Sequence, residues 1–251
     1  MKLFRTASLL IALAGLISNV AAQQKNTMEK SLSSRETQLV GIAAYTAKGD
    51  LLKLKRELNT SLNAGLTISE IKEAIVQLYA YCGFPRSIRG LQTLMVVLDE
   101  RKATGISDKP GPEASPVKDQ RDKYDRGKEI LEKLTGTPQN GPRAGYAAFA
   151  PEIEIFLKEH LFADIFERDV LSYSDRELVT ISVLSSIGGV EPMLSSHFNI
   201  CLHIGLTPGQ LQEFVHLIKS NLGVKEAKSA QNVLDQVLQS NGIKVRFPNN
   251  L

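Results

Sequence analysis

The chain has 251 residues, of which 43% are hydrophobic and 23% are charged. This composition is typical of a globular protein with one substantial core or two smaller ones. The formal net charge is only +3, and Lys2 and Arg5 near the N-terminus account for two of those charges. Such a balance gives no reason to expect nucleic acid or an anionic membrane as a partner.

The N-terminus has the pattern of a secretory leader. Two basic residues precede an apolar run at 7–17 that is too short to span a bilayer comfortably, and small residues follow at Val20 and Ala22. We therefore expect a signal peptide at 1–22, cleaved after Ala22, and a mature protein that is periplasmic or secreted. An uncleaved N-terminal anchor is the alternative. No later segment of the sequence is apolar enough to suggest a membrane span.

The rest of the sequence repeats itself at an offset of 139 to 140 residues. Leu39 and Val40 correspond to Leu178 and Val179. Further matches pair Gly65, Leu66 and Thr67 with Gly205, Leu206 and Thr207, Ile71 and Glu73 with Leu211 and Glu213, and Gly83 with Gly223. A fixed offset over this length indicates two copies of one structural unit.

The two copies are separated by a segment rich in proline, glycine and charge. This segment, 103–123, has the composition of a linker. We therefore expect a first copy at 23–102 and a second copy at 124–251.

Each copy has the pattern of helices. Apolar residues recur at helical spacing, and no run of alternating β-branched residues is bounded by turns, so the predicted class is all-α. The Gly-Leu-Thr element predicts a helix stop and restart, with Gly65 as a left-handed cap and Thr67 as the next N-cap. Glu70 completes a capping box with Thr67. The second copy begins with a short helix ending at Gly136 and a longer one at 150–168.

The segments YDRGKEILEKLTG (124–136), APEIEIFLKEHLFADIFERDVLSYSDRELVTISVL (150–184) and SSHFNICLHIGLT (195–207) together resemble the carboxymuconolactone decarboxylase family, which is related to the AhpD-type alkylhydroperoxidases. The resemblance implies an AhpD-like helical bundle, here as two tandem copies. It also implies a homo-oligomer, with a trimer of two-copy chains favoured, and a small-molecule substrate.

The resemblance places His197 at the family's active-site histidine. An imidazole can give or take a proton near neutral pH, so His197 is the candidate acid/base. Glu177, on the preceding helix, falls where the family has an acid, and it could orient His197 or share its proton. The alternative for Glu177 is a helix-surface carboxylate beside Arg176.

Two further residues are candidates for substrate binding. Arg176 could hold a substrate carboxylate through a bidentate pair, or it could be an exposed salt-bridge partner. Glu191 precedes His197 by six residues. It could be a pocket carboxylate, or it could favour the helix dipole at the start of its helix.

Cys82 and Cys201 are the two cysteines, and we expect free thiols rather than a disulfide. Cys201 lies one turn beyond His197 and could be a nucleophile, with a buried structural thiol as the alternative. The related peroxidases use a C-x-x-C pair at the positions that Val190 and Met193 occupy here. A metal site is not expected, because His203 is six residues from His197 and so lies roughly opposite on the helix.

The first copy departs from the pattern, because Glu57 stands where the second copy has His197. We interpret the first copy as a structural partner that can complete its neighbour's pocket, with a site of different chemistry as the alternative. The favoured function is a cofactor-free acid/base enzyme acting on a small carboxylated or lactone substrate. The alternatives are a peroxide-reducing antioxidant using Cys201 and a non-catalytic binding protein on the same fold.

Overall fold

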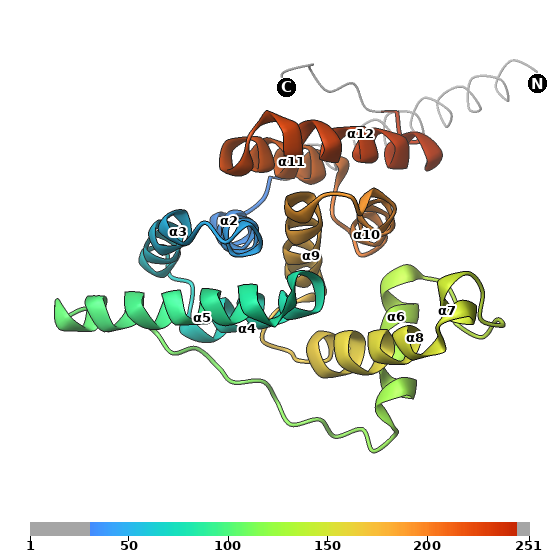
Figure 1. Cartoon of the computed structure of the whole chain (residues 1–251), viewed down its shortest axis with the longest axis horizontal. Coiled ribbons are helices and arrows are strands. Elements are labelled where there is room, and N and C mark those ends of the chain that lie inside the picture. The colour runs from blue at the N-terminus through green and yellow to red at the C-terminus, as the bar shows by residue number, and fades with distance from the viewer. Residues whose placement is uncertain (1–30, 245–251) are drawn as a thin grey trace, which may run out of the picture.

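Figure 1 shows the computed structural model of the chain, which describes residues 31–244. The predicted signal peptide lies outside the described residues. The helices are α2 (Ser34–Lys48), α3 (Leu51–Asn63), α4 (Ile68–Gln77), α5 (Tyr79–Ala103), α6 (Lys123–Thr135), α7 (Tyr146–Phe149), α8 (Pro151–Phe156), the π-helix η1 (Leu157–Phe166), α9 (Tyr173–Ile187), α10 (Glu191–His203), α11 (Pro208–Leu222) and α12 (Val224–Ser240).

The all-α prediction is confirmed, since residues 31–244 contain helices and no strand. The repeat appears as two sets of corresponding helices: α2, α3, α4 and α5 in the first copy, and α9, α10, α11 and α12 in the second. The helices α2 and α9 occupy corresponding positions and pack against each other in the middle of the molecule (Figure 1).

The two copies share their hydrophobic cores through these central helices. Leu39 of α2 lies in the core of the first copy, whereas the next residue, Val40, lies in the core of the second. The matched pair on α9 behaves in the same way: Leu178 lies in the second core and Val179 in the first. All four side chains are fully buried. Because burying such side chains is a main source of folding free energy, neither copy has a complete core without the other.

A matched pair of glutamates also crosses between the copies. Glu73 of α4 forms ion pairs with Arg168, at 2.6 Å, and with Arg176 at the start of α9. Its counterpart Glu213, on α11, accepts a hydrogen bond from the backbone N–H of Leu32, just before α2, at 2.7 Å. Each glutamate therefore ties its own copy to the start of the other copy's central helix.

The predicted stops and starts of the helices are present. Gly65 and Gly205 adopt φ values of 98° and 99°, which a side chain would strain, and both follow the end of a helix. The predicted capping box of Thr67 and Glu70 is present, and Thr207 forms the same arrangement with Gln210. The predicted stop at Gly136 is the C-cap of α6.

The segment predicted as one helix at 150–168 has a different form. It begins as the short α8 and then widens into the π-helix η1. Here α6 packs so closely that a Cβ atom at Gly127 would lie 1.9 Å from the carbonyl oxygen of Lys158. Glycine is therefore needed at position 127, because any side chain would collide with the backbone of η1.

The connection between the copies contains no helix from 106 to 122. It runs beside α4, where the N–H groups of Ile68 and Ser69 donate to the carbonyls of Lys109 and Pro110, at 3.0 and 2.9 Å. These bonds satisfy donors at the helix start that have no intrahelical partner. Within 31–244, no helix combines the length and hydropathy needed to cross a membrane.

Candidate active site

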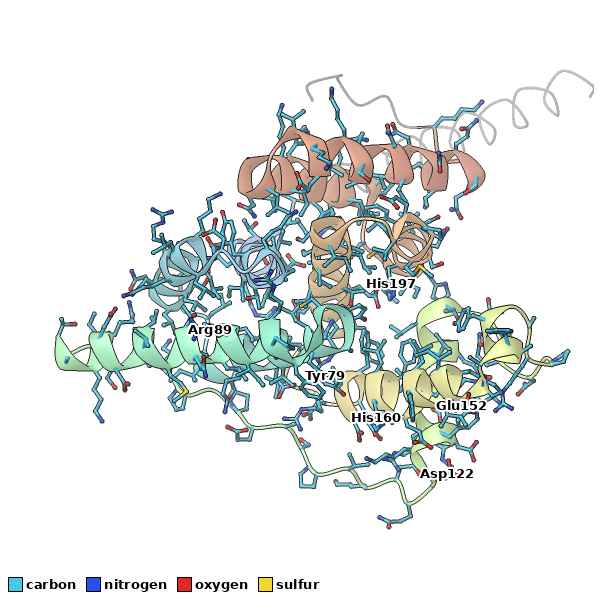
Figure 2. The ribbon with its side chains drawn as sticks, in the orientation of Figure 1. Tyr79, Arg89, Asp122, Glu152, His160 and His197 are labelled. Atoms are coloured by element: carbon cyan, nitrogen blue, oxygen red, sulfur yellow. The ribbon has the colours of Figure 1, made fainter. Side chains whose placement is uncertain are left out.

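His197 and Glu177 form a close pair between two helices of the second copy. The imidazole Nδ1 of His197, on α10, lies 2.7 Å from a carboxylate oxygen, Oε2, of Glu177 on α9. The Glu177 side chain is fully buried, and the His197 side chain is 13% exposed. Figure 2 places His197 near the junction of α9, α10 and the start of α5. The alternative of a surface carboxylate at Glu177 is therefore wrong.

The contact to Glu177 determines which imidazole nitrogen is open. With Nδ1 engaged by the carboxylate, the natural arrangement is an Nδ1–H donor and an available Nε2. Within residues 31–244, Nε2 has no hydrogen-bond partner, and neither does the second carboxylate oxygen, Oε1, of Glu177. A partly exposed imidazole backed by a buried carboxylate is an arrangement that can give and take a proton.

A tyrosine from the first copy lies against the same histidine. The ring centroids of Tyr81 and His197 are 6.3 Å apart, and their planes meet at 75°. The Tyr81 hydroxyl lies 3.1 Å from Oγ1 of Thr180, which is three residues after Glu177 on α9. Burial and the nearby charge of Glu177 both raise the pKa of Tyr81, so the phenol stays neutral. Sequence reasoning missed this residue because it lies in the other copy.

Arg176 lies in the interior rather than at the surface. Its side chain is fully buried, and its guanidinium donates to Glu73 Oε2 at 3.1 Å, to Gln77 Oε1 at 3.1 Å and to the carbonyl of Arg168 at 2.8 Å. Burial acts to raise the pKa of Glu73, but the hydrogen bonds from Arg168 and Arg176 outweigh burial and lower it. The exposed salt bridge considered for Arg176 is therefore wrong. Because its Nη atoms are held by protein groups, the geometry favours a structural role over contact with a substrate carboxylate.

Glu191 and His197 are not brought together. Glu191 is exposed at the first position of α10 and accepts a hydrogen bond from Ser229 at 3.2 Å. It lines a separate depression of about 320 Å³ near the end of α9, whose lining does not include His197. Its own backbone N–H, and then Ser229, lower the pKa of Glu191. These contacts favour the helix-start role over substrate binding.

Both cysteines are free thiols, as predicted. Cys201 is fully buried, and burial followed by the charge of Glu177 raises its pKa well above the ordinary value. Burial also raises the pKa of Cys82, to about 11. A nucleophilic thiol must be ionised and accessible, and neither condition is met at Cys201. Within the described part of the chain, no three His, Cys, Asp or Glu side chains gather as a metal site would require.

A comparison with protein-family models matches two ranges, 13–94 and 151–236, to the model described as "Carboxymuconolactone decarboxylase family". Together they span more than half of the chain. The chain belongs to the carboxymuconolactone decarboxylase family. The two ranges correspond to the two copies, so the expected fold, an AhpD-like bundle built from tandem units, is confirmed. The first range starts inside the segment predicted as a leader.

The chain is also similar to one curated member of the family. The protein is a 4-carboxymuconolactone decarboxylase from Acinetobacter baylyi, 25% identical over 122 residues. The matched region covers 48% of this chain and 90% of that relative. The relative is therefore about the size of one copy.

The present chain also has an apolar groove where its first copy meets its second. It has a volume of about 680 Å³ and is formed by the start of α5 from the first copy and by α8 and η1 from the second. Its lining is Tyr79, Ala80, Phe84, Ile153, Phe156, Leu157, His160 and Leu161. Figure 2 shows Tyr79 and His160 there. His197 does not line the groove, but Tyr79 and Tyr81 pack on one apolar cluster with Ile200, one turn after His197.

The corresponding position in the first copy has a different environment. Glu57 is half-buried, and its side chain has no hydrogen bond or ion pair within residues 31–244. Its carboxylate lies against α2 at Gly41, where a Cβ atom would be 2.7 Å from Oε1. Burial raises the pKa of Glu57. The first copy therefore has a protonatable group at this position but lacks the paired arrangement of His197 and Glu177.

Proposed function

We propose that the protein is a cofactor-free acid/base enzyme that decarboxylates a small carboxylated lactone, with His197 as the acid/base. The observation that carries the proposal is the 2.7 Å contact between His197 Nδ1 and the buried Glu177, which leaves Nε2 open. The name of the Acinetobacter relative, 4-carboxymuconolactone decarboxylase, supports this substrate class.

The chemistry requires one proton for each carbon dioxide released. The bond between the substrate carbon and its carboxylate breaks, and the electron pair moves into the unsaturated lactone, where the carbonyl oxygen gains negative charge. His197 in its imidazolium form delivers the proton from Nε2 to carbon, and solvent then protonates the imidazole again. Glu177 orients the imidazole and stabilises the imidazolium, as a buried carboxylate does in other acid/base pairs.

The alternative based on a peroxide-reducing thiol has less support. Cys201 is fully buried with a raised pKa, and Cys82 is only partly exposed, also with a raised pKa. The C-x-x-C positions hold Val190 and Met193. A binding protein without activity is distinguished from an enzyme only by the assay.

The experiment follows 4-carboxymuconolactone by ultraviolet absorbance and measures carbon dioxide release in parallel. The protein starts at Gln23. We expect equal amounts of lactone consumed and carbon dioxide formed, and a loss of roughly 100-fold or more in His197→Ala. His216→Ala is the matched control, because His216 is exposed on α11. Equal activity in His197→Ala and the wild type would overturn the role of His197.

We also propose that the mature protein is exported after cleavage behind Ala22, that it consists of copies at 23–102 and 124–251, and that it forms a homo-oligomer, with a trimer favoured. The exposed Phe84, Ile153 and Phe156 on the groove are large apolar groups of the kind that subunit contacts cover. N-terminal sequencing of the secreted or periplasmic fraction tests the cleavage. Light scattering of the purified protein tests the assembly, with a mass of one chain as the contradicting result.

A further inference from the structure

The first copy contributes an aromatic side chain to the histidine of the second copy. Tyr81 lies at the start of α5, before the break at Gly83, and it reaches across the interface between the copies to α9 and α10. Its counterpart in the repeat is Asn221, which reaches across the same interface in the opposite direction and accepts a hydrogen bond from Tyr45 at 3.1 Å. The two crossing positions are thus equivalent in place but different in chemistry.

The hydrogen bonds around Thr180 determine the direction of the Tyr81 hydroxyl. Thr180 Oγ1 donates its single proton to the carbonyl of Arg176 at 2.9 Å and accepts from Gln77 Nε2 at 3.0 Å. A hydroxyl has one proton and two lone pairs, so the third contact, from Tyr81, fills the second lone pair. Tyr81 is therefore the donor to Thr180, and its own lone pairs remain open.

The ring of Tyr81 is also in a defined relation to the imidazole. A separation of 6.3 Å at 75° is an edge-to-face arrangement, in which the positive edge of one ring faces the negative face of the other. The open lone pairs of the Tyr81 oxygen are the negative end of the hydroxyl dipole, and they favour a positively charged imidazole. Within residues 31–244, the titratable groups that form a hydrogen bond or a ring contact with His197 are Glu177 from α9 and Tyr81 from α5. Arg176, also on α9, is engaged by Glu73.

We propose that Tyr81 is a positioning residue for His197, which the first copy supplies to orient the imidazole and raise its affinity for a proton. This inference rests on the proposed function for its consequence in catalysis, but its physical basis is independent of any substrate. It gives the first copy a role in the site although Glu57 replaces the histidine there. The raised pKa of the phenol is consistent with a neutral tyrosine throughout the working pH range.

The experiment measures the titration of His197 by NMR with imidazole-labelled protein. Tyr81→Phe removes the hydroxyl but retains the ring, and Tyr45→Phe is the matched control, since Tyr45 is a partly buried tyrosine on α2 that bonds Asn221. We expect the His197 midpoint to fall by about 0.5 pH units or more in Tyr81→Phe. In Tyr45→Phe, we expect it to stay within about 0.1 units.

A second variant tests the same link from the other side. Thr180→Val removes the acceptor that holds the Tyr81 hydroxyl, and we expect a shift in the same direction. If Tyr81→Phe does not fold, this variant decides the question. A midpoint that stays within about 0.1 units of the wild type in every folded variant at 81 and 180 would overturn the proposal.

Kinetics separate this proposal from the proposed function. If the wild type consumes 4-carboxymuconolactone, we expect Tyr81→Phe to lower kcat about tenfold with KM changed by less than about threefold. A change in KM alone would contradict a positioning role. If the wild type does not consume the lactone, the proposed substrate fails, and the NMR titration still decides whether Tyr81 acts on His197.

Discussion

The two copies share a set of four corresponding helices but differ at the positions of the candidate site. In the second copy, the positions are Glu177 and His197, which lie 2.7 Å apart. The matched positions in the first copy are the buried Gln38 and the half-buried Glu57. A Glu–His pair can hold and transfer a proton near neutral pH, whereas an amide does not titrate. The repeat therefore retains its architecture in both halves and an acid/base pair in only one.

Two matched pairs of positions that connect the copies hold the same residue type in both halves. The matched glutamates Glu73 and Glu213 both reach the start of the other copy's central helix, and the matched valines Val40 and Val179 both enter the other copy's core. Core contacts of this kind are required in both halves, because the two cores share their central helices. The proposed acid/base pair, in contrast, is needed only once for one site.

The largest expected effect comes from removing the charge behind the histidine. Glu177→Gln preserves the shape but removes the negative charge that stabilises the imidazolium, and its amide can force the wrong imidazole tautomer. We expect kcat to fall by roughly 100-fold or more. Gln38→Ala, at the matched position of the first copy, is the control and should retain kcat within about threefold. Steady-state kinetics with the lactone measure both, and an unaffected Glu177→Gln would show that the carboxylate is not needed.

The next effect concerns stability at the interface between the copies. Glu73→Gln leaves the buried guanidinium of Arg176 without its charged partner, at a cost on the order of 3–5 kcal/mol. Glu213→Gln removes a carboxylate that accepts from a backbone N–H, and we expect a loss of about 1–2 kcal/mol. Urea unfolding measures the two free energies. Equal losses would contradict the expectation that the charged partner of Glu73 makes its contact stronger than the contact of Glu213 to a backbone N–H.

Glu57 gives a smaller effect that depends on pH. Burial raises its pKa, so the folded protein binds the proton more tightly than the unfolded chain. Ionising Glu57 in its half-buried position lowers the free energy of unfolding. This loss is absent below the pKa of Glu57 in the unfolded chain and appears as pH rises through its pKa in the folded protein. Glu57→Gln should thus unfold at a higher temperature than the wild type at pH 7, and the difference should vanish near pH 4. A difference that is constant with pH would show that ionisation of Glu57 is not its origin.

The smallest expected effect is at Cys201. The matched residue in the first copy is Ser61, a buried serine whose hydroxyl donates to the carbonyl of Glu57 at 2.8 Å. A serine at 201 can make the same bond to the carbonyl of His197, so Cys201→Ser should lose less than about 1 kcal/mol. Thermal unfolding and lactone turnover should both stay near the wild type. A complete loss of turnover with an intact fold would instead indicate a reactive thiol.

Much of the fold could be predicted from local signals. The capping box of Thr67 and Glu70 and the stop at Gly136 depend on neighbouring residues in the chain, so the sequence shows them directly. The π-helix η1 was not predicted, because its form accompanies a close approach to Gly127 of another helix. The exchange of Val40 and Val179 between cores depends on how α2 and α9 pack, which periodicity does not reveal.

The candidate site was predictable only within one copy. The resemblance of the second copy to the family points to His197 and Glu177. They lie on two consecutive helices of that copy, α10 and α9, whose packing brings the two side chains into contact. The burial of Arg176 depends on Glu73 and Gln77, about 100 positions earlier in the chain. Tyr81 lies across the same interface. A weak signal existed, since Glu73 and Glu213 match in the repeat, but the sequence does not show which element each one reaches.

The most direct test of the account compares matched substitutions at the two equivalent positions in one assay. His197→Ala and Glu57→Ala are measured side by side for kcat/KM with 4-carboxymuconolactone. The account predicts a loss of roughly 100-fold or more in His197→Ala and a change of less than about threefold in Glu57→Ala. Comparable losses in both variants, or a larger loss in Glu57→Ala, would contradict an acid/base site confined to the second copy.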